Sequence, residues 1–462
     1  MRSHSRRGRR LAAPLLILLV LGALWPRTRV PPVSSYDQRF YLGIAYDLLH
    51  LHRFTDGFAY AGGGPDSPRP AGMRFTPLYP ALLAAAALAD PRLARSMACT
   101  VATAGRDPGC PRDAPLIRLL QVLMLAGFYW LVWLGIEASS GSTGAAWAGL
   151  LLALLTAPGL LGFAATLMTE ILSLLLSAGA CCLAARTLAR DPRRAGGWFA
   201  CALLLGLATL TRPVFLVLVW GGLGVAILAL VRWRRAALAP AAAFAGGSAL
   251  TLLPWILRNA LVLNRAALSF GYASHTLIQR LAFDTMTRRE YALSFVCWLP
   301  DGSGLGRLLA GRGACDRFGW DEHADSFYAI GTGPLLRQSL AASGGWAHHM
   351  SYIVHHYLLA HPLRYLAVSL PLALRGLYVD HYWGLLLAPC SLVLLLGALR
   401  QRRWRVVALS LPAWLLLLVN AFVAVNQPRY NMLLILPFSL AGGLLLAPVP
   451  RHLGRLLQKH VA

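Results

Sequence analysis

Long apolar runs separated by short basic segments make up most of this chain. The runs indicate ten membrane spans, at 11–25, 116–136, 144–160, 163–185, 197–211, 213–231, 238–257, 383–399, 406–425 and 431–447. Most of them reach the ~20 residues that an α-helix needs to cross a bilayer. The pattern therefore predicts an all-α polytopic membrane protein with about ten transmembrane helices, organised as a single membrane domain over residues 1–462.

Two long segments, 27–115 and 259–382, interrupt the spans and predict two large loops. In the first loop, apolar residues repeat at helical spacing between Tyr36 and Phe54, which predicts an amphipathic helix lying along the membrane surface. A second apolar helix is expected at 81–89. In the second loop, the glycine-rich run 302–306 predicts a flexible stretch, because glycine breaks regular structure.

The composition agrees with a membrane protein. Hydrophobic residues make up 57% of the 462 residues and charged residues 13%, about half the charged fraction of ordinary globular proteins. This balance excludes a typical soluble enzyme, a disordered chain and a fibrous protein.

The charge of the chain predicts its topology. The 43 Lys and Arg residues outnumber the 18 acids, which in a soluble protein would suggest a nucleic-acid partner. With the N-terminus inside, the short inner segments hold 19 of the 43 basic residues, whereas the two long loops hold 15 of the 18 acids. Because basic residues collect on the cytoplasmic side, we expect both termini inside, both long loops outside, a location in the inner (plasma) membrane, and no nucleic-acid partner.

The eight cysteines fall into two groups. Four lie in apolar spans, where cysteine commonly acts as a small hydrophobic residue. The other four lie two to a loop, which predicts the disulfides Cys99–Cys110 and Cys297–Cys315 in an oxidising compartment, with unpaired thiols as the alternative.

The sequence requires no cofactor. No phosphate-binding GxxxxGK[ST] motif is present, so this chain does not itself use ATP to drive transport. The histidines at 348–361 do not have the spacing of a zinc site on one helix, and their aromatic neighbours favour an interfacial belt. The site prediction therefore includes no metal ligand, although the sequence leaves a divalent metal open.

Charged residues at the outer ends of the spans carry the candidate chemistry. Asp37 follows the first span, and Glu170 lies near the outer end of an apolar span, where a carboxylate is costly and indicates a functional cavity. Four arginines lie near outer ends, at positions 74, 212, 258 and 429. Carboxylates and arginines together suit a phosphorylated lipid whose headgroup lies in the interface. The structural alternatives are that Asp37 only caps a helix, that Glu170 only pairs with an arginine, and that the arginines extend to lipid headgroups.

These residues resemble the GT-C superfamily of polyprenyl-phosphate-sugar glycosyltransferases, in the branch of bacterial protein O-mannosyltransferases, lipid A aminoarabinose transferase and rhizobial core galacturonosyltransferases. Members of that branch place an acidic pair followed by Tyr and Ala after the first span, and here Asp37, Tyr41 and Ala45 match while Gln38 replaces the second acid. The remaining matches are Arg74 before Pro77-Leu78-Tyr79-Pro80, Glu170, Arg258 in Pro-Trp-x-x-Arg-Asn, and Arg429-Tyr430 followed by Pro437. The segment with Cys99 and Cys110 and the content of 265–345 are not part of the pattern.

The resemblance implies that a sugar moves from a polyprenyl-phosphate donor to an acceptor hydroxyl on a lipid, glycan or protein of the cell envelope. Asp37 would be the general base, with Glu170 supporting it. Arg258 and Arg429, then Arg74, would bind the donor phosphate, with Tyr41 and Tyr430 in the substrate site. Two other classes stay open: a transporter or flippase of lipid-linked sugar, and a non-catalytic scaffold, which Gln38 favours.

Overall fold

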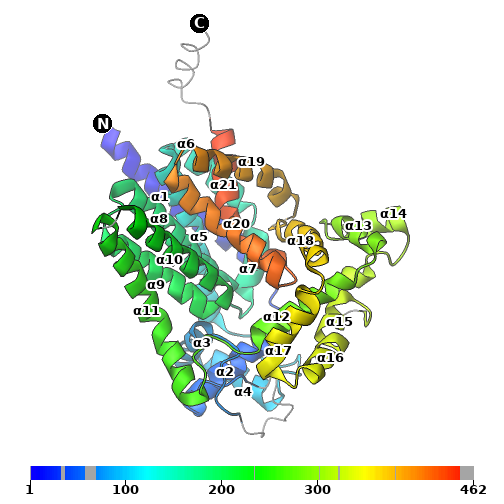
Figure 1. Cartoon of the computed structure of the whole chain (residues 1–462). Coiled ribbons are helices and arrows are strands. Elements are labelled where there is room, and N and C mark those ends of the chain that lie inside the picture. The colour runs from blue at the N-terminus through cyan, green and yellow to red at the C-terminus, as the bar shows by residue number, and fades with distance from the viewer. Residues whose placement is uncertain are drawn as a thin grey trace.

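The computed structural model describes residues 2–32, 37–57, 69–233, 235–300, 302–320, 323–379 and 381–447. Regular secondary structure in these residues is helical, and the only strand-like pairing among them is an isolated bridge between Thr55 and Ala71. Long helices form a bundle, and shorter helices gather at one end and one side of it (Figure 1).

The bundle contains the helices α1 (Arg2–Leu24), α5 (Pro115–Ser140), α6 (Thr143–Leu154), α7 (Ala157–Ala165), α8 (Glu170–Arg190), α9 (Ala195–Thr211), α10 (Leu216–Trp233), α11 (Arg235–Leu263), α19 (His381–Arg400), α20 (Trp404–Val423) and α21 (Ile435–Leu446). Two 3-10 helices, η2 (Pro213–Phe215) and η6 (Pro428–Leu434), lead into α10 and α21. In the core of the bundle, α9 packs against α8 and α11, and α21 packs against α6 and α19. Gly149 and Gly443 let α6 and α21 approach closely, since a Cβ on either would lie within 2.6 Å of a backbone oxygen of the other helix.

The helices confirm the predicted class of fold. Within the described residues, seven helices are long and apolar enough to cross a membrane, or up to nine if each of two bent helix pairs is one span. The expected span 144–160 is one of these pairs, α6 and α7, with a bend of 56°. The span expected at 163–185 begins only at Glu170, because residues 163–165 belong to α7 and the chain turns between the two helices. The runs at 11–25 and 197–211 form apolar helices below the length of a full span.

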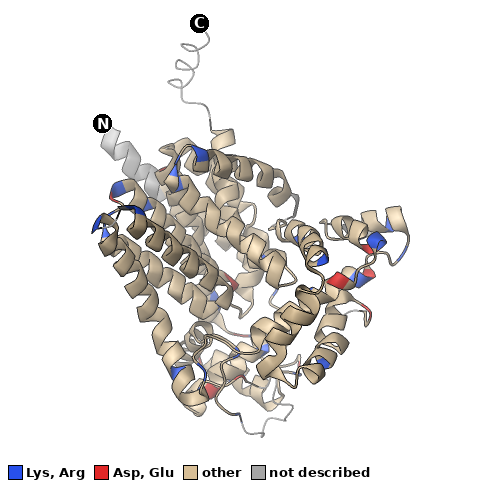
Figure 2. Cartoon of the chain, in the orientation of Figure 1, with Lys and Arg blue, Asp and Glu red and all other residues tan. Residues whose placement is uncertain are grey.

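Arginines gather at the end of the bundle where α1 begins and α21 ends (Figure 2). They lie at the junctions of α8 with α9 and of α19 with α20, where Arg190, Arg193 and Arg400 are exposed. The helices between the two ends carry few charges (Figure 2). The basic junctions therefore share one side with the start of α1.

The first loop contains α2 (Gln38–His50), α3 (Leu78–Ala89) and α4 (Pro91–Ala102), which pack together beyond the other end of the bundle (Figure 1). The α2 helix is amphipathic as predicted, with Ile44 and Ala45 fully buried. Tyr36, where the prediction began, lies outside the described residues, and α4 was not predicted.

The second loop contains α12 (Tyr272–Leu281), η3 (Ala282–Thr285), α13 (Arg288–Cys297), α14 (Gly302–Ala310), η4 (Asp316–Phe318), α15 (Phe327–Thr332), α16 (Pro334–Ala342), α17 (Trp346–Ile353), the π-helix η5 (Val354–Leu358) and α18 (Pro362–Gly376). The prediction of a flexible glycine-rich stretch at 302–306 is wrong, because these residues begin α14. Gly306 faces the sulfurs of Cys297 and Cys315, where a Cβ would lie 2.2 Å from the Cys315 Sγ. Close packing against a disulfide thus favours glycine inside a helix here.

Both predicted disulfides are present. Cys99 is joined to Cys110, and Cys297 to Cys315. The first links the end of α4 to the segment before α5, and the second links α13 to the segment after α14. The four cysteines of the spans (Cys181, Cys182, Cys201 and Cys390) are free thiols.

Candidate active site

Glu170 is the first residue of α8, and only 2% of it is exposed. A carboxylate at this position is favoured by the positive end of the helix dipole. Two arginines reach it from other helices: Arg212 Nη1 lies 3.2 Å and Arg429 Nη1 3.7 Å from the same oxygen, Glu170 Oε1. The buried carboxylate is therefore compensated by two cations from distant parts of the sequence, as a charge inside a membrane protein requires.

Local sequence explains how the two arginines arrive. Pro213 follows Arg212 and disfavours a helical conformation there, so α9 ends at Thr211 and Arg212 is extended, with φ −145° and ψ 119°. Pro428 begins η6, and Arg429 is its second residue. Tyr430 lies beside both arginines, with its ring centroid 4.9 Å from the Arg212 guanidinium carbon and 5.4 Å from that of Arg429.

Asp37 lies immediately before α2 and is half-buried. Burial raises the pKa of its carboxyl; Arg429 opposes this shift, Glu170 adds to it, and Arg212 and Arg39 oppose it. Loss of solvation therefore outweighs the nearby positive charge in setting the pKa of this carboxyl. The same contributions bring Asp37 into the electrostatic environment of Glu170 and its two arginines.

The Asp37 side chain makes no capping hydrogen bond to α2 in the described part of the chain. Its backbone carbonyl instead accepts a hydrogen bond from the Phe40 N–H, at 3.0 Å. The interpretation of Asp37 as a side-chain cap therefore finds no support in the geometry.

Gln38, which stands where the related pattern has a second acid, is fully buried. Its amide Nε2 donates to the Pro32 carbonyl at 3.1 Å, and its Oε1 accepts from the Leu167 N–H at 2.8 Å. Gln38 thereby joins the segment before Asp37 to the segment before Glu170. A glutamate could accept the second hydrogen bond but, when ionised, could not donate the first.

Aromatic residues surround the two acids. Tyr41 packs edge-on against Phe75 and Tyr79, with ring centroids 5.6 and 5.4 Å away. Burial raises the pKa of the Tyr41 hydroxyl well above its usual value, and the charge of Asp37 raises it further. Tyr41 is therefore a neutral hydroxyl at physiological pH, able to donate a hydrogen bond.

A pocket of about 20 Å³ adjoins Glu170, Ser173, Arg212, Arg429 and Tyr430. Its volume is about that needed for one water molecule. Glu170 Oε2 is buried and has no hydrogen-bond partner among the described residues. The two guanidiniums at Oε1 make this carboxylate a poor ligand for a metal cation, because they place positive charge where the cation would lie.

One group of three potential metal ligands occurs in the described residues, formed by Cys99, Asp107 and Cys110. Two of these three are joined in a disulfide, so their sulfurs are not available as thiolate ligands. The group therefore offers no metal centre.

Arg74 points toward the second loop. Its Nη2 lies 3.0 Å from His275 Nδ1, and its guanidinium carbon lies 5.1 Å from the Trp346 ring. Burial lowers the pKa of His275 to about 4, and the charges of Arg74 and His349 lower it further. His275 is therefore neutral at physiological pH and can accept the hydrogen bond from Arg74.

Arg258 binds backbone of the first loop. Its Nη1 donates to the Gly72 carbonyl at 2.6 Å and to Asn259 Oδ1 at 2.9 Å, and its Nη2 donates to the Phe54 carbonyl at 2.9 Å. Phe54 and Gly72 are also joined by a backbone hydrogen bond of 3.0 Å, so Arg258 closes the base of a loop. The assignment of Arg258 to the donor phosphate stays a prediction, and a phosphate there would compete with these acceptors.

We expect Arg258→Lys to lower thermal stability more than it impairs catalysis. Lysine keeps the positive charge, but its single ammonium group cannot donate to all the acceptors that the planar guanidinium of arginine reaches. Each hydrogen bond to a charged group contributes about 1.5–3 kcal/mol to stability. Thermal unfolding and donor-concentration kinetics of the variant would measure the two effects. A large rise in the KM for the donor without loss of stability would instead identify Arg258 as a phosphate ligand.

The site combines four residues predicted from the sequence with one whose role the sequence does not indicate. Asp37, Glu170, Arg429 and Tyr430 belong to one electrostatic cluster, which also includes Arg212. From the sequence, Arg212 is one of several arginines near outer helix ends, and Thr-Arg-Pro after an apolar run is the signal that marks it. Arg74 and Arg258 contact other residues, His275 and the Gly72 carbonyl respectively.

No protein-family model matches the sequence, and no curated protein matches it. Among solved structures, the chain is similar to the archaeal oligosaccharyltransferase AglB from Archaeoglobus fulgidus, solved in complex with an inhibitory peptide and a dolichol-phosphate. The match covers 98% of this chain and 52% of that chain, with 14% sequence identity and a TM-score of 0.49. The chain thus spans about half the length of the archaeal enzyme.

Proposed function

We propose that this protein is a membrane glycosyltransferase of the GT-C type that moves a sugar from a polyprenyl-phosphate donor to an acceptor hydroxyl of the cell envelope. The observation that carries the proposal is the buried cluster in which Arg212 and Arg429 share one oxygen of Glu170 beside Asp37. The second arginine and the nearby carboxylate are suited to an anionic substrate and to a proton transfer.

The net charge of the cluster is complementary to that of a lipid-phosphate donor. When both acids are ionised, Asp37 and Glu170 balance Arg212 and Arg429, and Arg39 adds a further positive charge that acts on Asp37. A lipid phosphodiester would supply one negative charge and make the site neutral. Such neutrality favours the binding of an anionic donor at the membrane surface.

In the proposed reaction, the acceptor oxygen forms a bond to the anomeric carbon while the bond between that carbon and the phosphate oxygen breaks. The electron pair of the broken bond stays on the phosphate, which gains negative charge that Arg429 and Arg212 stabilise. Asp37 accepts the proton of the acceptor hydroxyl, and its raised pKa makes it a better base than an exposed aspartate. Glu170 is already bonded to the arginines and orients them.

The test uses purified protein in detergent with a radiolabelled polyprenyl-phosphate sugar and an envelope extract as the source of acceptor. We expect labelled product and free polyprenyl phosphate to form together. Turnover without a membrane boundary would exclude a pure transporter, whereas binding without turnover would favour the scaffold. A mass spectrum of the envelope glycans from a deletion strain would then identify the sugar and the acceptor.

The proposed orientation places the basic junctions in the cytoplasm, since positive residues are retained there. We expect a phosphatase fusion after residue 330 to be active and one after residue 403 to be inactive. Active fusions at 403 and inactive fusions at 330 would contradict the functional proposal as well, because Asp37 and Glu170 would then face the cytoplasm.

A further inference from the structure

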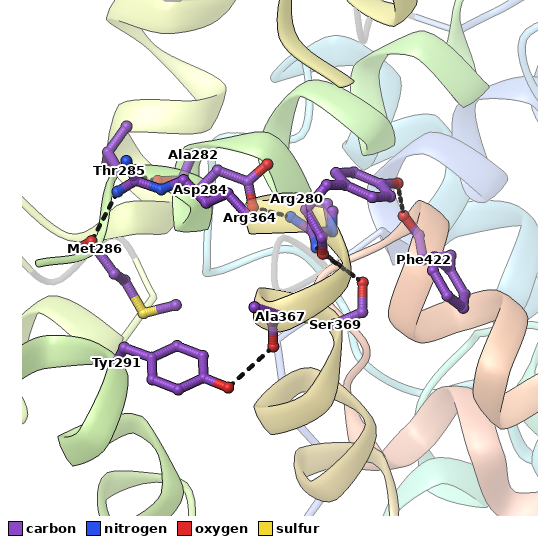
Figure 3. Close-up of polar contacts among 11 residues, drawn as sticks. Arg280, Ala282, Asp284, Thr285, Met286, Tyr291, Arg364, Ala367, Ser369 and Phe422 are labelled. Carbon is purple, nitrogen blue, oxygen red and sulfur yellow. Dashed lines mark hydrogen bonds and ion pairs between the residues drawn. The ribbon is translucent and has the colours of Figure 1, made fainter. Parts of the chain in front are cut away.

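A groove of about 530 Å³ lies between α18 and the start of α13 with the two residues before it, apart from the cluster around Glu170. Met286, Tyr291, Ala367 and Val368 supply apolar surface to its walls, and Arg288 and Arg364 also line it. Two hydrogen bonds join the walls: Tyr291 donates to the Ala367 carbonyl at 3.2 Å, and Arg364 donates to the Met286 carbonyl at 2.8 Å (Figure 3). The groove is therefore a built feature with cationic and apolar parts.

The acids near the groove are paired with arginines outside its lining, and the positive charge of Arg364 also acts on one of them, Asp284. Asp284 forms an ion pair with the buried Arg280, which also donates to Ser369 at 2.9 Å (Figure 3). Arg280 donates to the Tyr365 carbonyl as well, at 2.7 Å. Glu290 is paired with Arg317. Arg288 and Arg364 are both exposed, and the hydrogen bond to Met286 uses one of the five N–H donors of Arg364. Two guanidiniums can thus meet an anion at the groove.

Apolar surface next to the groove indicates contact with lipid. Along α18, Leu363, Leu366 and Leu370 are exposed at helical spacing, and Leu363 is 81% exposed. The same helix packs against the candidate span α20 on one side and α13 on the other. The leucines therefore continue the apolar surface of the bundle up to the groove.

The neighbouring helix α14 repeats this pattern. Leu308 is 81% and Leu309 63% exposed, while Gly306 faces the disulfide on another side of the helix and Arg307 is exposed. Arg289 donates to the Ala310 carbonyl at 3.3 Å and, with the disulfide, holds α14 against α13. Figure 1 shows both helices projecting sideways from the bundle beside α18. An amphipathic helix held rigidly in this place suits the surface of a bilayer.

We propose that the groove binds the phosphate of an anionic membrane phospholipid at Arg288 and Arg364, while the leucines of α14 and α18 contact its acyl-chain region. Paired guanidiniums recognise phosphate oxygens, and the apolar walls accept the start of an acyl chain. The volume lies in the usual range of small-molecule sites. The site is distinct from the proposed donor site and does not depend on the proposed activity.

The first experiment measures lipid binding by native mass spectrometry of the full chain in detergent, with phosphatidylglycerol, phosphatidylcholine and inorganic phosphate. We expect phosphatidylglycerol to bind more tightly than phosphatidylcholine, and Arg288→Gln with Arg364→Gln to weaken phosphatidylglycerol binding about tenfold. The double variant Arg95→Gln with Arg337→Gln removes the same charge from exposed positions outside the groove and should bind normally. Arg288→Gln alone keeps the Arg364–Met286 bond and guards against a folding defect.

The second experiment places a photoreactive phenylalanine analogue at Leu308 or at Arg307 of the chain in vesicles of mixed phosphatidylglycerol and phosphatidylcholine. We expect lipid adducts from position 308 and few from position 307. Equal affinity for the two lipids, equal loss in the control variant, displacement of phosphatidylglycerol by equimolar inorganic phosphate, or protein adducts at 308 would each overturn the proposal.

Discussion

Replacing Asp37 by Asn is expected to lower turnover by 10²–10⁴-fold, or about 3–5 kcal/mol of activation barrier, because asparagine cannot accept the acceptor's proton. The side chain makes no capping hydrogen bond to α2, so the substitution should leave the fold unchanged. Steady-state turnover and thermal unfolding of the same preparation would separate the two effects. A folded variant with near-normal turnover would remove Asp37 from the catalytic role.

Asp90 is a matched control. It precedes α4, and its side chain accepts a hydrogen bond from the Arg92 N–H at 3.0 Å, which is a true helix cap. Its other oxygen, Oδ2, accepts from the Leu116 N–H at 3.3 Å, so Asp90→Ala should lose more than the about 1 kcal/mol of a cap alone and retain turnover.

Asp37 also predicts the pH dependence. Its pKa is raised above the ordinary value of 3.8, and only the deprotonated carboxylate can act as base. Turnover should therefore be low where Asp37 is protonated and rise with pH as it loses its proton. The midpoint of this rise should lie at a higher pH than the pKa of an exposed aspartate. Asp37→Asn should abolish this rise in the pH profile of its residual activity.

Replacing Arg429 or Arg212 by Lys is expected to lower kcat by about 10²–10³-fold, since the departing phosphate loses a positioned donor. The ammonium group of lysine keeps a positive charge beside the buried Glu170 carboxylate. The loss of stability should therefore be smaller than for a substitution by alanine. Donor kinetics with both single variants would measure the effect. If both keep normal kcat while Arg258→Lys does not, the phosphate lies at Arg258 instead.

The helical membrane architecture could be predicted from the sequence because apolar runs indicate the spans, although ten spans were expected and the described residues hold seven to nine candidates. The orientation inferred from the basic junctions stays a prediction. Glu170 could be selected as well, since a carboxylate beside an apolar run is costly unless it has a partner. The partner itself could not be named, because arginines near helix ends look alike in one dimension. Arg212 and Arg429 meet Glu170, whereas Arg258 binds the Phe54 and Gly72 carbonyls.

Two other features of the structure could not be predicted from the sequence, for reasons of local packing and hydrogen bonding. The prediction of a flexible stretch at 302–306 is wrong, because packing against the Cys297–Cys315 disulfide outweighs the low helix propensity of glycine. Gln38 could not be interpreted from its mismatch alone, because its role depends on two segments that meet only in the folded chain. Spacing along the sequence indicates which residues share a helix face, but it does not fix these long-range contacts.

The enclosed cluster at Glu170 has a consequence for how tightly a donor can be held. Its pocket has room for about one water molecule, and Gln38 ties together the two segments that carry the acids. If a sugar phosphate enters by these two segments moving apart, only the fraction of molecules in that open conformation can bind it, and the measured affinity is lowered by that fraction. If that conformation makes up about 1% of the molecules, the apparent dissociation constant is about a hundredfold weaker than the intrinsic one. Substitutions that loosen the Gln38 tie would then tighten donor binding while they lower stability.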